Sequence, residues 1–373
     1  MSSADLEAKI VIAYPYVPHY RYGIFKKLED RISDITFISG RASKDGSIAT
    51  IPEGTFKKEA QVENVWFGPF LWQKGLHRKL RDASPEAVVF MGDAAHLSTW
   101  VQAIIARIRR QKVYFWTIGW HRPDHGIRKI VRLLFYRIAN DLLIYGNHGR
   151  KLGEIAGYPK DRMTVIYNSW DSLVSTQDFQ LVPNGLPDGE RPVIGAVIRL
   201  NPSKGLPDIV KSIAYLRDQY GVEADGLIIG EGPEREKLEA LASELNVNLF
   251  LPGAVYNSEV LKMVYEKLTV TVVPKAAGLT VIQSLTEGVP VVTVADPNLQ
   301  MPEFEAIEDG VTGSLVETTD ASSIAGACAF WIERSRTASS EIREACQNMI
   351  QSYWSPQSQA DRIISFLRDK KQI

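Results

Sequence analysis

The feature that most constrains this chain is an alternation of short apolar runs with longer amphipathic stretches, which occurs in two series. Short apolar runs have the length of buried strands, whereas the longer stretches follow the helical period. Because consecutive parallel strands need a crossover, the alternation predicts an α/β fold with doubly wound parallel sheets. The expected strands span residues 9–14, 35–39, 87–91, 113–117, 142–145 and 164–167 in the first series, and 193–197, 226–229, 248–251, 269–273 and 290–294 in the second.

Helical stretches fill several of the intervals between these runs. Between the two series lies segment 181–191, in which Pro, Gly and Asp are frequent, as is typical of a linker. We therefore expect Rossmann-like domains at residues 1–183 and 190–350, with the ligand site in the crevice at the carboxyl ends of their strands. The clearest helices are expected at residues 22–31, 98–111, 126–140, 205–220 and 233–245.

Length and composition exclude several classes of protein. The 373 residues suffice for two domains, and 45% apolar with 23% charged residues is typical of a globular chain. No apolar run approaches the roughly 18 residues of a spanning helix, and the N-terminus lacks the pattern of a signal peptide. Cys328 and Cys346 suit neither a disulfide framework nor a structural zinc site. We expect a cytoplasmic protein.

The net charge of −1 conceals an imbalance between the halves. Residues 1–185 carry 26 Lys and Arg against 18 Asp and Glu, whereas residues 186–373 carry 17 against 26. A near-neutral chain without a known nucleic-acid module argues against a nucleic-acid partner. The basic residues around the stretch 126–140 either form a solvated face over a buried apolar one or dock on an anionic membrane surface. They are Arg107, Arg109, Arg110, Lys112, Arg128, Lys129, Arg132 and Arg137.

Two strand ends in the second half are suited to a phosphate ligand. The loop after residues 193–197 carries Arg199 and Lys204, and it either binds a diphosphate or is an ordinary basic loop. The strand at 226–229 ends in Gly230-Glu231-Gly232-Pro233, where Pro233 suits the first position of a helix. These glycines either admit a ligand to the backbone or form an ordinary turn.

A third strand end, in segment 273–292, has a turn of small residues before a helix expected from 279 to 287. The amides of Gly278, Leu279 and Thr280 open that helix, and a helix N-terminus attracts phosphate. Farther along, Glu305 lies on a turn ahead of the tight turn Asp309-Gly310.

In this order and spacing, these motifs resemble those of the retaining GT-B glycosyltransferases of family 4 (glycosyl transferases group 1), of the bacterial polysaccharide type. The resemblance is close over residues 193–316 and looser over the first half. It implies that the second domain holds a nucleoside diphosphate sugar, with Arg199 and Lys204 neutralising the leaving diphosphate. It also implies that residues 351–373 form a helix that packs back on the first domain.

One position departs from the family pattern. The family has a Glu-x7-Glu motif across the small-residue turn, and the matching residues here are Lys275 and Gln283. Gln283 still donates and accepts hydrogen bonds, as contact with ribose hydroxyls requires. Lys275 reverses the charge near the donor sugar, which fits an acidic sugar, a different catalytic arrangement or lost activity.

The resemblance places the acceptor site in the first domain. His19, Tyr20 and Arg21 follow its first strand, and His121 and Arg122 follow the strand at 113–117. His121 aligns approximately with a catalytic-site histidine of the family and would position or relay a proton at the acceptor hydroxyl, unless it is a structural residue of an aromatic loop.

The sequence therefore predicts a retaining, metal-independent glycosyltransferase that uses no cofactor. It would move a sugar from a nucleoside diphosphate sugar to a hydroxyl of a saccharide acceptor, lipid-linked, in surface polysaccharide biosynthesis. Two alternatives stay open: an inactive relative acting as a binding or scaffold subunit, and a GT-B epimerase acting on the sugar nucleotide. The expected donor-binding residues, besides Arg199 and Lys204, are Gly230, Gly232, Pro233, Lys275, Gly278, Leu279, Thr280, Gln283 and Glu305.

Overall fold

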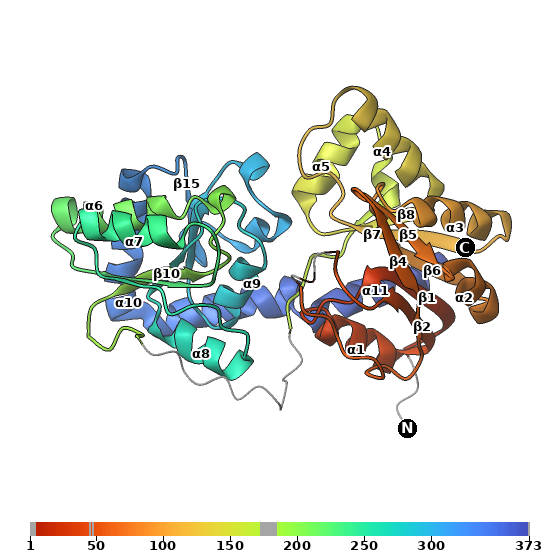
Figure 1. Cartoon of the computed structure of the whole chain (residues 1–373), viewed down its shortest axis with the longest axis horizontal. Coiled ribbons are helices and arrows are strands. Elements are labelled where there is room, and N and C mark those ends of the chain that lie inside the picture. The colour runs from red at the N-terminus through yellow and green to blue at the C-terminus, as the bar shows by residue number, and fades with distance from the viewer. Residues whose placement is uncertain (1–4, 45, 47, 172–184, 372–373) are drawn as a thin grey trace. The chain divides into compact units, whose positions relative to one another are not determined.

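A computed structural model describes residues 5–44, 46, 48–171 and 185–371 (Figure 1). The chain divides into two compact units, Met1–Leu173 with Ser355–Ile373 and Val174–Trp354. The first four residues of the expected linker 181–191 lie outside the described residues. Each unit is an α/β layer structure with helices on both faces of a sheet (Figure 1).

The first unit is built on a seven-stranded parallel sheet in the order β3-β2-β1-β6-β7-β8-β9. The strands are β1 (Leu6–Tyr16), β2 (Ile32–Gly40), β3 (Glu59–Gln61), β6 (Ala87–Met91), β7 (Lys112–Thr117), β8 (Asp141–Ile144) and β9 (Met163–Val165). The helices between them are α1 (Tyr22–Arg31), α2 (Leu76–Ala83), α3 (Leu97–Ile108), α4 (Gly126–Ile138) and α5 (Asn147–Ala156). An antiparallel hairpin, β4 (Glu63–Phe67) with β5 (Phe70–Lys74), was not expected from the sequence.

Successive side chains of β1 enter two different cores, because side chains alternate across a strand. Ile10 and Ile12 pack with α1 on one face of the sheet, while Val11 and Ala13 pack with α2 and α3 on the other. A strand buried on both faces has the continuous apolar sequence that β1 shows. The apolar runs in the sequence therefore identify the central strands correctly.

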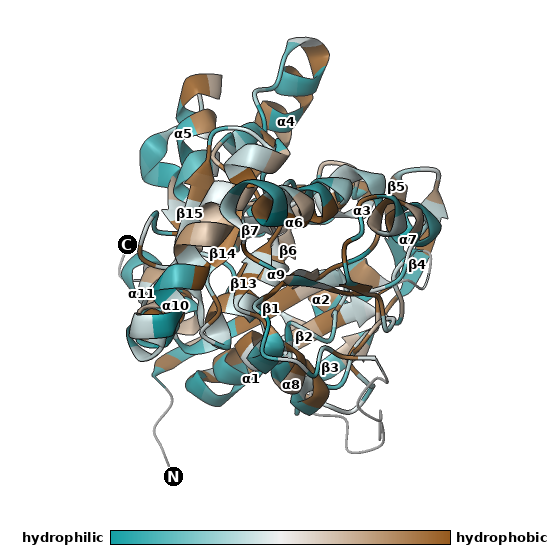
Figure 2. Ribbon diagram, turned by 90° about the vertical axis from the view of Figure 1, so that its left-hand side faces the viewer, coloured by the Kyte–Doolittle hydropathy of each residue, from teal (hydrophilic) through white to brown (hydrophobic). Residues whose placement is uncertain are grey.

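The second unit has a six-stranded parallel sheet in the order β12-β11-β10-β13-β14-β15. The strands are β10 (Val193–Val197), β11 (Asp225–Ile229), β12 (Leu249–Phe250), β13 (Val270–Val272), β14 (Val291–Val294) and β15 (Gly313–Val316). The helices are α6 (Pro207–Tyr220), α7 (Arg235–Glu244), α8 (Ser258–Lys267), α9 (Leu279–Thr286) and α10 (Ala321–Met349). Figure 2 shows hydrophobic residues along the strands and mixed colours on the covering helices, as this layering requires.

The C-terminal helix returns to the first unit. A π-helical turn (Ile350–Trp354) follows α10, and α11 (Pro356–Lys371) then packs against α1. Ile363, Ile364 and Leu367 are buried in the same core as Ile10 and Ile12 of β1. Helix α11 thus completes one face of the first sheet, as the resemblance implied.

Over the described residues, no helix combines the length and the apolar character needed to cross a bilayer.

Candidate functional site

The candidate donor site lies at the carboxyl ends of three neighbouring strands of the second unit. In this sheet β10 lies between β11 and β13, and all three run parallel. The loops that follow them therefore emerge at one edge of the sheet. They carry Arg199 and Lys204 after β10, the Gly230–Pro233 segment after β11, and the turn around Lys275 after β13.

The loops after β10 and β11 are joined by backbone hydrogen bonds. The amide of Leu200 donates to the carbonyl of Glu231 at 3.0 Å, and the amide of Glu234 donates to the carbonyl of Leu200 at 3.1 Å. Gly230 has a φ of +154°, and a Cβ placed there would lie 1.9 Å from the carbonyl oxygen of Ile198. A Cβ at Gly232 would lie 2.5 Å from the carbonyl oxygen of Leu200. Both positions require glycine because the loop that carries Arg199 packs directly against them.

The expectation that Pro233 opens the next helix is wrong. Residues 233 and 234 form a turn, and α7 begins at Arg235. The reason is the contact just described, since the hydrogen bond from Glu234 to Leu200 turns the chain before the helix can start. Pro233 thus belongs to the strand-end turn.

Lys204 is held against the turn that follows β13. Its Nζ donates to the carbonyl oxygen of Ala276 at 2.7 Å, and its own carbonyl accepts from the amide of Lys275 at 3.3 Å. Burial lowers the pKa of the Lys204 ammonium, and the carboxylate of Glu303 opposes that shift. Ala276 has a φ of +52°, an uncommon conformation for a residue other than glycine. The lysine therefore stabilises an unusual turn.

Lys275 lies beside Lys204. A Cβ on Gly205 would lie 3.7 Å from Cδ of Lys275, so the stem of this lysine passes over the residue after Lys204. Lys275 is half-buried and makes no ion pair within the described part of the chain. Lys204 and Lys275 thus lie side by side at the carboxyl ends of β10 and β13.

Helix α9 begins at this turn. Gly278 is its N-cap and carries no side chain that would cover the free amides of the first turn. The Thr280 hydroxyl donates to the carbonyl oxygen of Val197 at 2.9 Å, which attaches the helix start to the end of β10. Farther along α9, Gln283 Oε1 accepts from the buried Tyr265 hydroxyl at 3.3 Å. The N-terminus of α9 therefore lies at the ends of these strands and has no side-chain cap from Gly278, an arrangement that suits an anion.

Two residues that sequence reasoning missed support the turn. Gln300, 1% exposed, accepts from the amide of Ala277 at 2.8 Å and donates to the Val294 carbonyl at 2.9 Å. Glu303, 4% exposed, supplies the carboxylate that acts on Lys204. Both come from the connection between β14 and β15, which has no periodic pattern; the only available signal was a run of polar residues after an apolar strand. Glu305 follows them, half-buried in a 3-10 turn (Pro302–Ala306).

In the first unit, Arg21 is buried in an aromatic cluster. Its guanidinium carbon lies 5.1 Å from the ring centroid of Tyr145 and 5.3 Å from that of Trp116, and it donates a hydrogen bond to the Tyr145 hydroxyl. Arg21 is 5% exposed, so little of its side chain can contact an acceptor. Arg21 is the N-cap residue of α1, so the turn into the helix directs its side chain inward. Here Arg21 fixes the loop between β1 and α1.

His19 and Tyr20 are half-buried on that loop. The His19 ring packs edge-on against Tyr20 with 5.4 Å between centroids, and its Nδ1 lies 3.1 Å from the carbonyl oxygen of Ala49. His121 and Arg122 follow β7, separated from β1 in the sheet by β6. The structure thus divides the expected acceptor residues between two loops at the same edge of the sheet.

The loop with His121 is held by Arg132 of α4. Arg132 Nε lies 2.8 Å from Asp124 Oδ2, and Nη1 donates to the carbonyl of Gly119 at 3.0 Å. Burial lowers the pKa of the His121 imidazole, and the charges of Arg122, His148 and Arg132 lower it further. A neutral imidazole near pH 7 is the form that accepts a proton. Arg122 is exposed.

Within the described residues, no three His, Cys, Asp or Glu side chains lie together in a way that would hold a metal ion.

One protein-family model matches the second unit. Residues 179–352 match the family model described as glycosyl transferases group 1, a span of a little under half of the chain that coincides with this unit. No protein with a curated function matches the sequence.

Solved structures match the whole chain. The Anabaena protein Alr3699/HepE, solved in complex with UDP, aligns with a TM-score of 0.70 at 16% identity and covers 97% of this chain and 100% of its own. The lipopolysaccharide outer core galactosyltransferase WaaB aligns with a TM-score of 0.66 at 15% identity, covering 96% and 99%. Sucrose-phosphate synthase from Thermosynechococcus elongatus aligns at 0.68 and 14% identity, covering 98% and 99%. The chain has the GT-B fold of these proteins, with two Rossmann-like domains.

Proposed function

Because residues 179–352 match the glycosyl transferases group 1 model, we propose that the protein transfers a sugar from a nucleoside diphosphate sugar to a hydroxyl of a saccharide acceptor. The observation that carries the proposal is the juxtaposition of Lys204, Lys275 and the N-terminus of α9 at one turn. The solved relative Alr3699/HepE has been crystallised with UDP-glucose, which supports a donor of this class.

In the proposed reaction, the diphosphate leaves from the anomeric carbon of the donor. Lys204 and Arg199, with the amides of residues 278–280, neutralise the charge that develops on the leaving phosphate. The bond between the anomeric carbon and the phosphate oxygen breaks while a bond to the acceptor oxygen forms on the same face, so the configuration is retained. The acceptor proton passes to the leaving phosphate oxygen, and no metal or cofactor takes part.

Donor binding is the first experimental test. We expect UDP or another nucleoside diphosphate to raise the Tm of the full chain, because a ligand that binds only the native state stabilises it. Lys204→Ala and Arg199→Ala should each weaken binding, by roughly 10-fold or more for a charge-assisted contact. Lys211→Ala is the matched control, since Lys211 is exposed on α6 and its nearest carboxylate is Asp208 at 3.8 Å. If all three variants bind the nucleotide as tightly as the wild type, Arg199 and Lys204 do not form a diphosphate site.

Product analysis separates transfer from the two alternatives. Transfer predicts a glycosylated acceptor when a nucleotide sugar and an oligosaccharide panel are supplied together. An epimerase would convert the donor without any acceptor, and a scaffold subunit would bind the nucleotide without consuming it. Nucleotide binding without turnover is included because Lys275 stands where the family has a glutamate.

We further propose that the acceptor is lipid-linked, that its product enters surface polysaccharide, and that the protein works at the cytoplasmic face of a membrane. The support is an apolar surface on α3 and α4, two helices that pack together. Leu97, Val101, Ile104 and Ile108 recur at helical spacing on α3 and are 39–76% exposed, and Ile127, Ile130, Val131 and Leu134 do so on α4 at 41–79%. In Figure 2 the ribbon of α4 carries both hydrophobic and hydrophilic colours.

Basic side chains border this α3–α4 surface and indicate which kind of partner it binds. Arg107, Arg109, Arg110, Lys112 and Arg128 are all exposed. An apolar stripe bordered by cations matches the interface of an anionic bilayer.

We expect the chain to sediment with vesicles containing phosphatidylglycerol and not with pure phosphatidylcholine. Ile108→Ser together with Ile127→Ser should abolish sedimentation, whereas Ile155→Ser, at an equally exposed position on α5, should not. A different result would assign the surface to a second copy of the chain. The wild type would then dimerise as its concentration rises without binding vesicles, and the double variant would stay monomeric.

A further inference from the structure

The β4–β5 hairpin carries a row of exposed aromatic side chains on one of its two faces. Residues directly opposite one another in an antiparallel pair share a face, and here Val65 pairs with Trp72 and Phe67 with Phe70. Phe67, Phe70 and Trp72 are 60%, 45% and 37% exposed, and Val65 is half-buried. We call these four residues the outer face of the hairpin. Large apolar side chains exposed side by side mark an interaction surface.

The opposite face of the hairpin anchors it to the first sheet. Asn64 Nδ2 donates to the carbonyl of Pro15 at 2.6 Å, and Gln73 Nε2 donates to the carbonyl of Tyr14 at 3.0 Å. Leu71, on the same face, is fully buried. The carboxyl end of β1 therefore holds the hairpin in place, and the outer face is presented on a fixed support.

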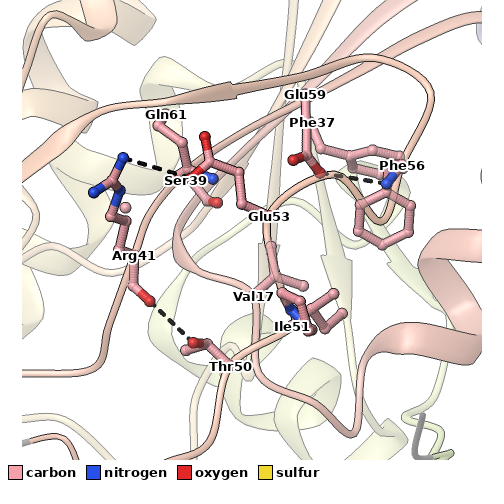
Figure 3. A pocket seen from close by; sticks show the side chains of 12 residues that line it. Val17, Phe37, Ser39, Arg41, Thr50, Ile51, Glu53, Phe56, Glu59 and Gln61 are labelled. Carbon is pink, nitrogen blue, oxygen red and sulfur yellow. Dashed lines mark hydrogen bonds and ion pairs between the residues drawn. The ribbon is translucent and has the colours of Figure 1, made fainter. Parts of the chain in front are cut away.

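A cavity of about 250 Å³ lies beside this attachment (Figure 3). Gly40 at the end of β2 lines it, and a Cβ on Gly40 would lie 2.3 Å from Nδ2 of Asn64. The other lining residues come mainly from β2, β3 and residues 50–56, and the four residues of the outer face are not among them. The outer face is therefore exposed to solvent and is not a wall of this cavity.

The tip of the hairpin combines two aromatic rings with a positive charge. Phe67 and Phe70 flank the two-residue turn Gly68-Pro69, in which Gly68 has a φ of +56°. The exposed Lys44 reaches this turn, because its Nζ donates to the Gly68 carbonyl at 2.7 Å and lies 5.7 Å from the ring centroid of Trp66. An ammonium group therefore lies next to the most exposed ring of the outer face.

The charge around the outer face is also positive. Residues 63–83, which comprise the hairpin and α2, contain four Lys or Arg against two Asp or Glu. Lys74 pairs with Glu63 at 3.1 Å at the base of the hairpin, and Arg78 and Arg81 are exposed on α2. Aromatic rings favour the interface of a bilayer, and cations favour anionic lipids. The charge and the side-chain types of the hairpin are thus complementary to an anionic lipid surface.

The size of the outer face argues against a protein partner. Each strand has five residues, so the face is about 17 Å long and two strands wide, which gives on the order of 200 Å². A stable protein interface takes about 800 Å² from each partner. A bilayer needs no complementary shape, because each ring that leaves water contributes by itself. A small aromatic face is therefore better suited to lipid than to a second protein surface.

We propose that the β4–β5 hairpin inserts its outer face into an anionic bilayer, an inference that rests on the membrane location proposed above. Phe67 and Phe70 enter the boundary between head groups and acyl chains, and Lys44 meets lipid phosphates. The hairpin is a separate element from the α3–α4 surface, although β5 packs against α3. It therefore supplies a second contact whose contribution can be measured independently.

A fluorescent label at the tip tests the insertion. Cys328 and Cys346 are both 0% exposed, so a thiol-reactive nitrobenzoxadiazole reacts selectively with Phe67→Cys in the folded full chain. We expect vesicles containing phosphatidylglycerol to shift the emission of this label to shorter wavelength, and acyl-chain quenchers to reduce it. The same label on Tyr220→Cys, at a 50% exposed position of α6, should not respond. An unshifted label at residue 67 on vesicles that bind the chain would contradict the proposal.

A pair of substitutions measures the contribution to binding. Phe67→Ser together with Phe70→Ser should weaken binding to these vesicles at least about 10-fold, because two exposed rings no longer leave water. The Tm should stay unchanged, since the anchoring residues Asn64, Leu71 and Gln73 are intact. Tyr220→Ser is the matched control and should bind like the wild type. Wild-type affinity in the double variant would overturn the role of the hairpin.

The remaining outcomes separate this proposal from those on which it rests. Vesicle binding that Ile108→Ser with Ile127→Ser abolishes, with the residue 67 label unshifted in the wild-type background, would overturn the hairpin alone. If the wild type binds no vesicles, both the hairpin and the membrane location are wrong, whereas transfer to a soluble acceptor without vesicles reports on the transferase function. A label shift that grows with protein concentration in the absence of vesicles would replace the lipid partner by a second copy of the chain.

Discussion

Gln300 makes a sharp test of how the donor site is held together. Its side chain is 1% exposed and takes part in three hydrogen bonds: it accepts from Ala277 N–H at 2.8 Å, and it donates to Thr293 Oγ1 and the Val294 carbonyl at 2.9 Å each. We consider Gln300→Leu, which keeps the approximate volume and removes every one of these bonds. The variant leaves the Ala277 amide and the Val294 carbonyl without this partner.

The expected cost follows from those two backbone groups. A buried donor or acceptor left unsatisfied costs about 1–3 kcal/mol, so the two together should cost about 2–6 kcal/mol. For a unit of this size, 1 kcal/mol shifts Tm by about 2–4 °C, which predicts a decrease of roughly 4–24 °C. Nucleotide binding should fall as well, because Ala277 lies in the turn that bears Lys275 and precedes α9.

The assay combines thermal unfolding with calorimetric titration of UDP. Gln347→Leu is the control, since Gln347 Nε2 makes one long bond of 3.4 Å to the Thr286 carbonyl, and it should lose less than about 1 kcal/mol. If Gln300→Leu unfolds at the wild-type temperature and binds UDP with wild-type affinity, the turn does not depend on this residue and the reasoning is refuted.

Three further predictions follow from the same geometry. Gly230→Ala should cost about 3 kcal/mol or more in chemical denaturation, because its Cβ would lie 1.9 Å from a carbonyl oxygen, whereas Gly221→Ala, with a φ of +65° and open space, should cost about 1 kcal/mol. Lys275→Glu should weaken UDP binding at least about 10-fold by placing a carboxylate beside the α9 N-terminus; an unchanged titration curve would exclude Lys275 from the anion site. His121 has a folded-state pKa below its unfolded value, so the unfolded chain takes up the proton more readily and stability is lost as the pH falls from about 6.5 through the folded-state pKa. His121→Asn should lose this part of the pH dependence in denaturation curves at pH 5 and pH 8.

The sequence was most informative where burial fixes the pattern. The strand β10 and the helix α1 have the bounds expected from apolar runs and helical spacing, because their side chains face one or two cores. The hairpin β4–β5 lies outside the main sheet, and exposed residues such as Phe67 and Phe70 give it no regular alternation. Pattern reasoning depends on burial, so it could not find this element.

In the candidate site, the sequence likewise predicts some residues and misses others. Lys204 and the turn before α9 were expected from strand-end chemistry, and the structure brings them together. Gln300 and Glu303 act from a connection that is distant in sequence, and their roles depend on contacts that only the folded chain creates. Arg21 was expected to bind the acceptor, and only the folded chain reveals that its neighbours are Trp116 and Tyr145.

The return of α11 to the first unit has a consequence for the order in which the domains mature on the ribosome. The second unit, Val174–Trp354, is continuous in sequence and is complete once Trp354 has emerged, whereas the first unit must wait for Ser355 and the residues after it. Until then, the face of β1 that Ile363, Ile364 and Leu367 later cover is exposed in the nascent chain. A truncation after residue 354 would therefore damage the domain that is synthesised first, and the shortened protein should aggregate through that uncovered face.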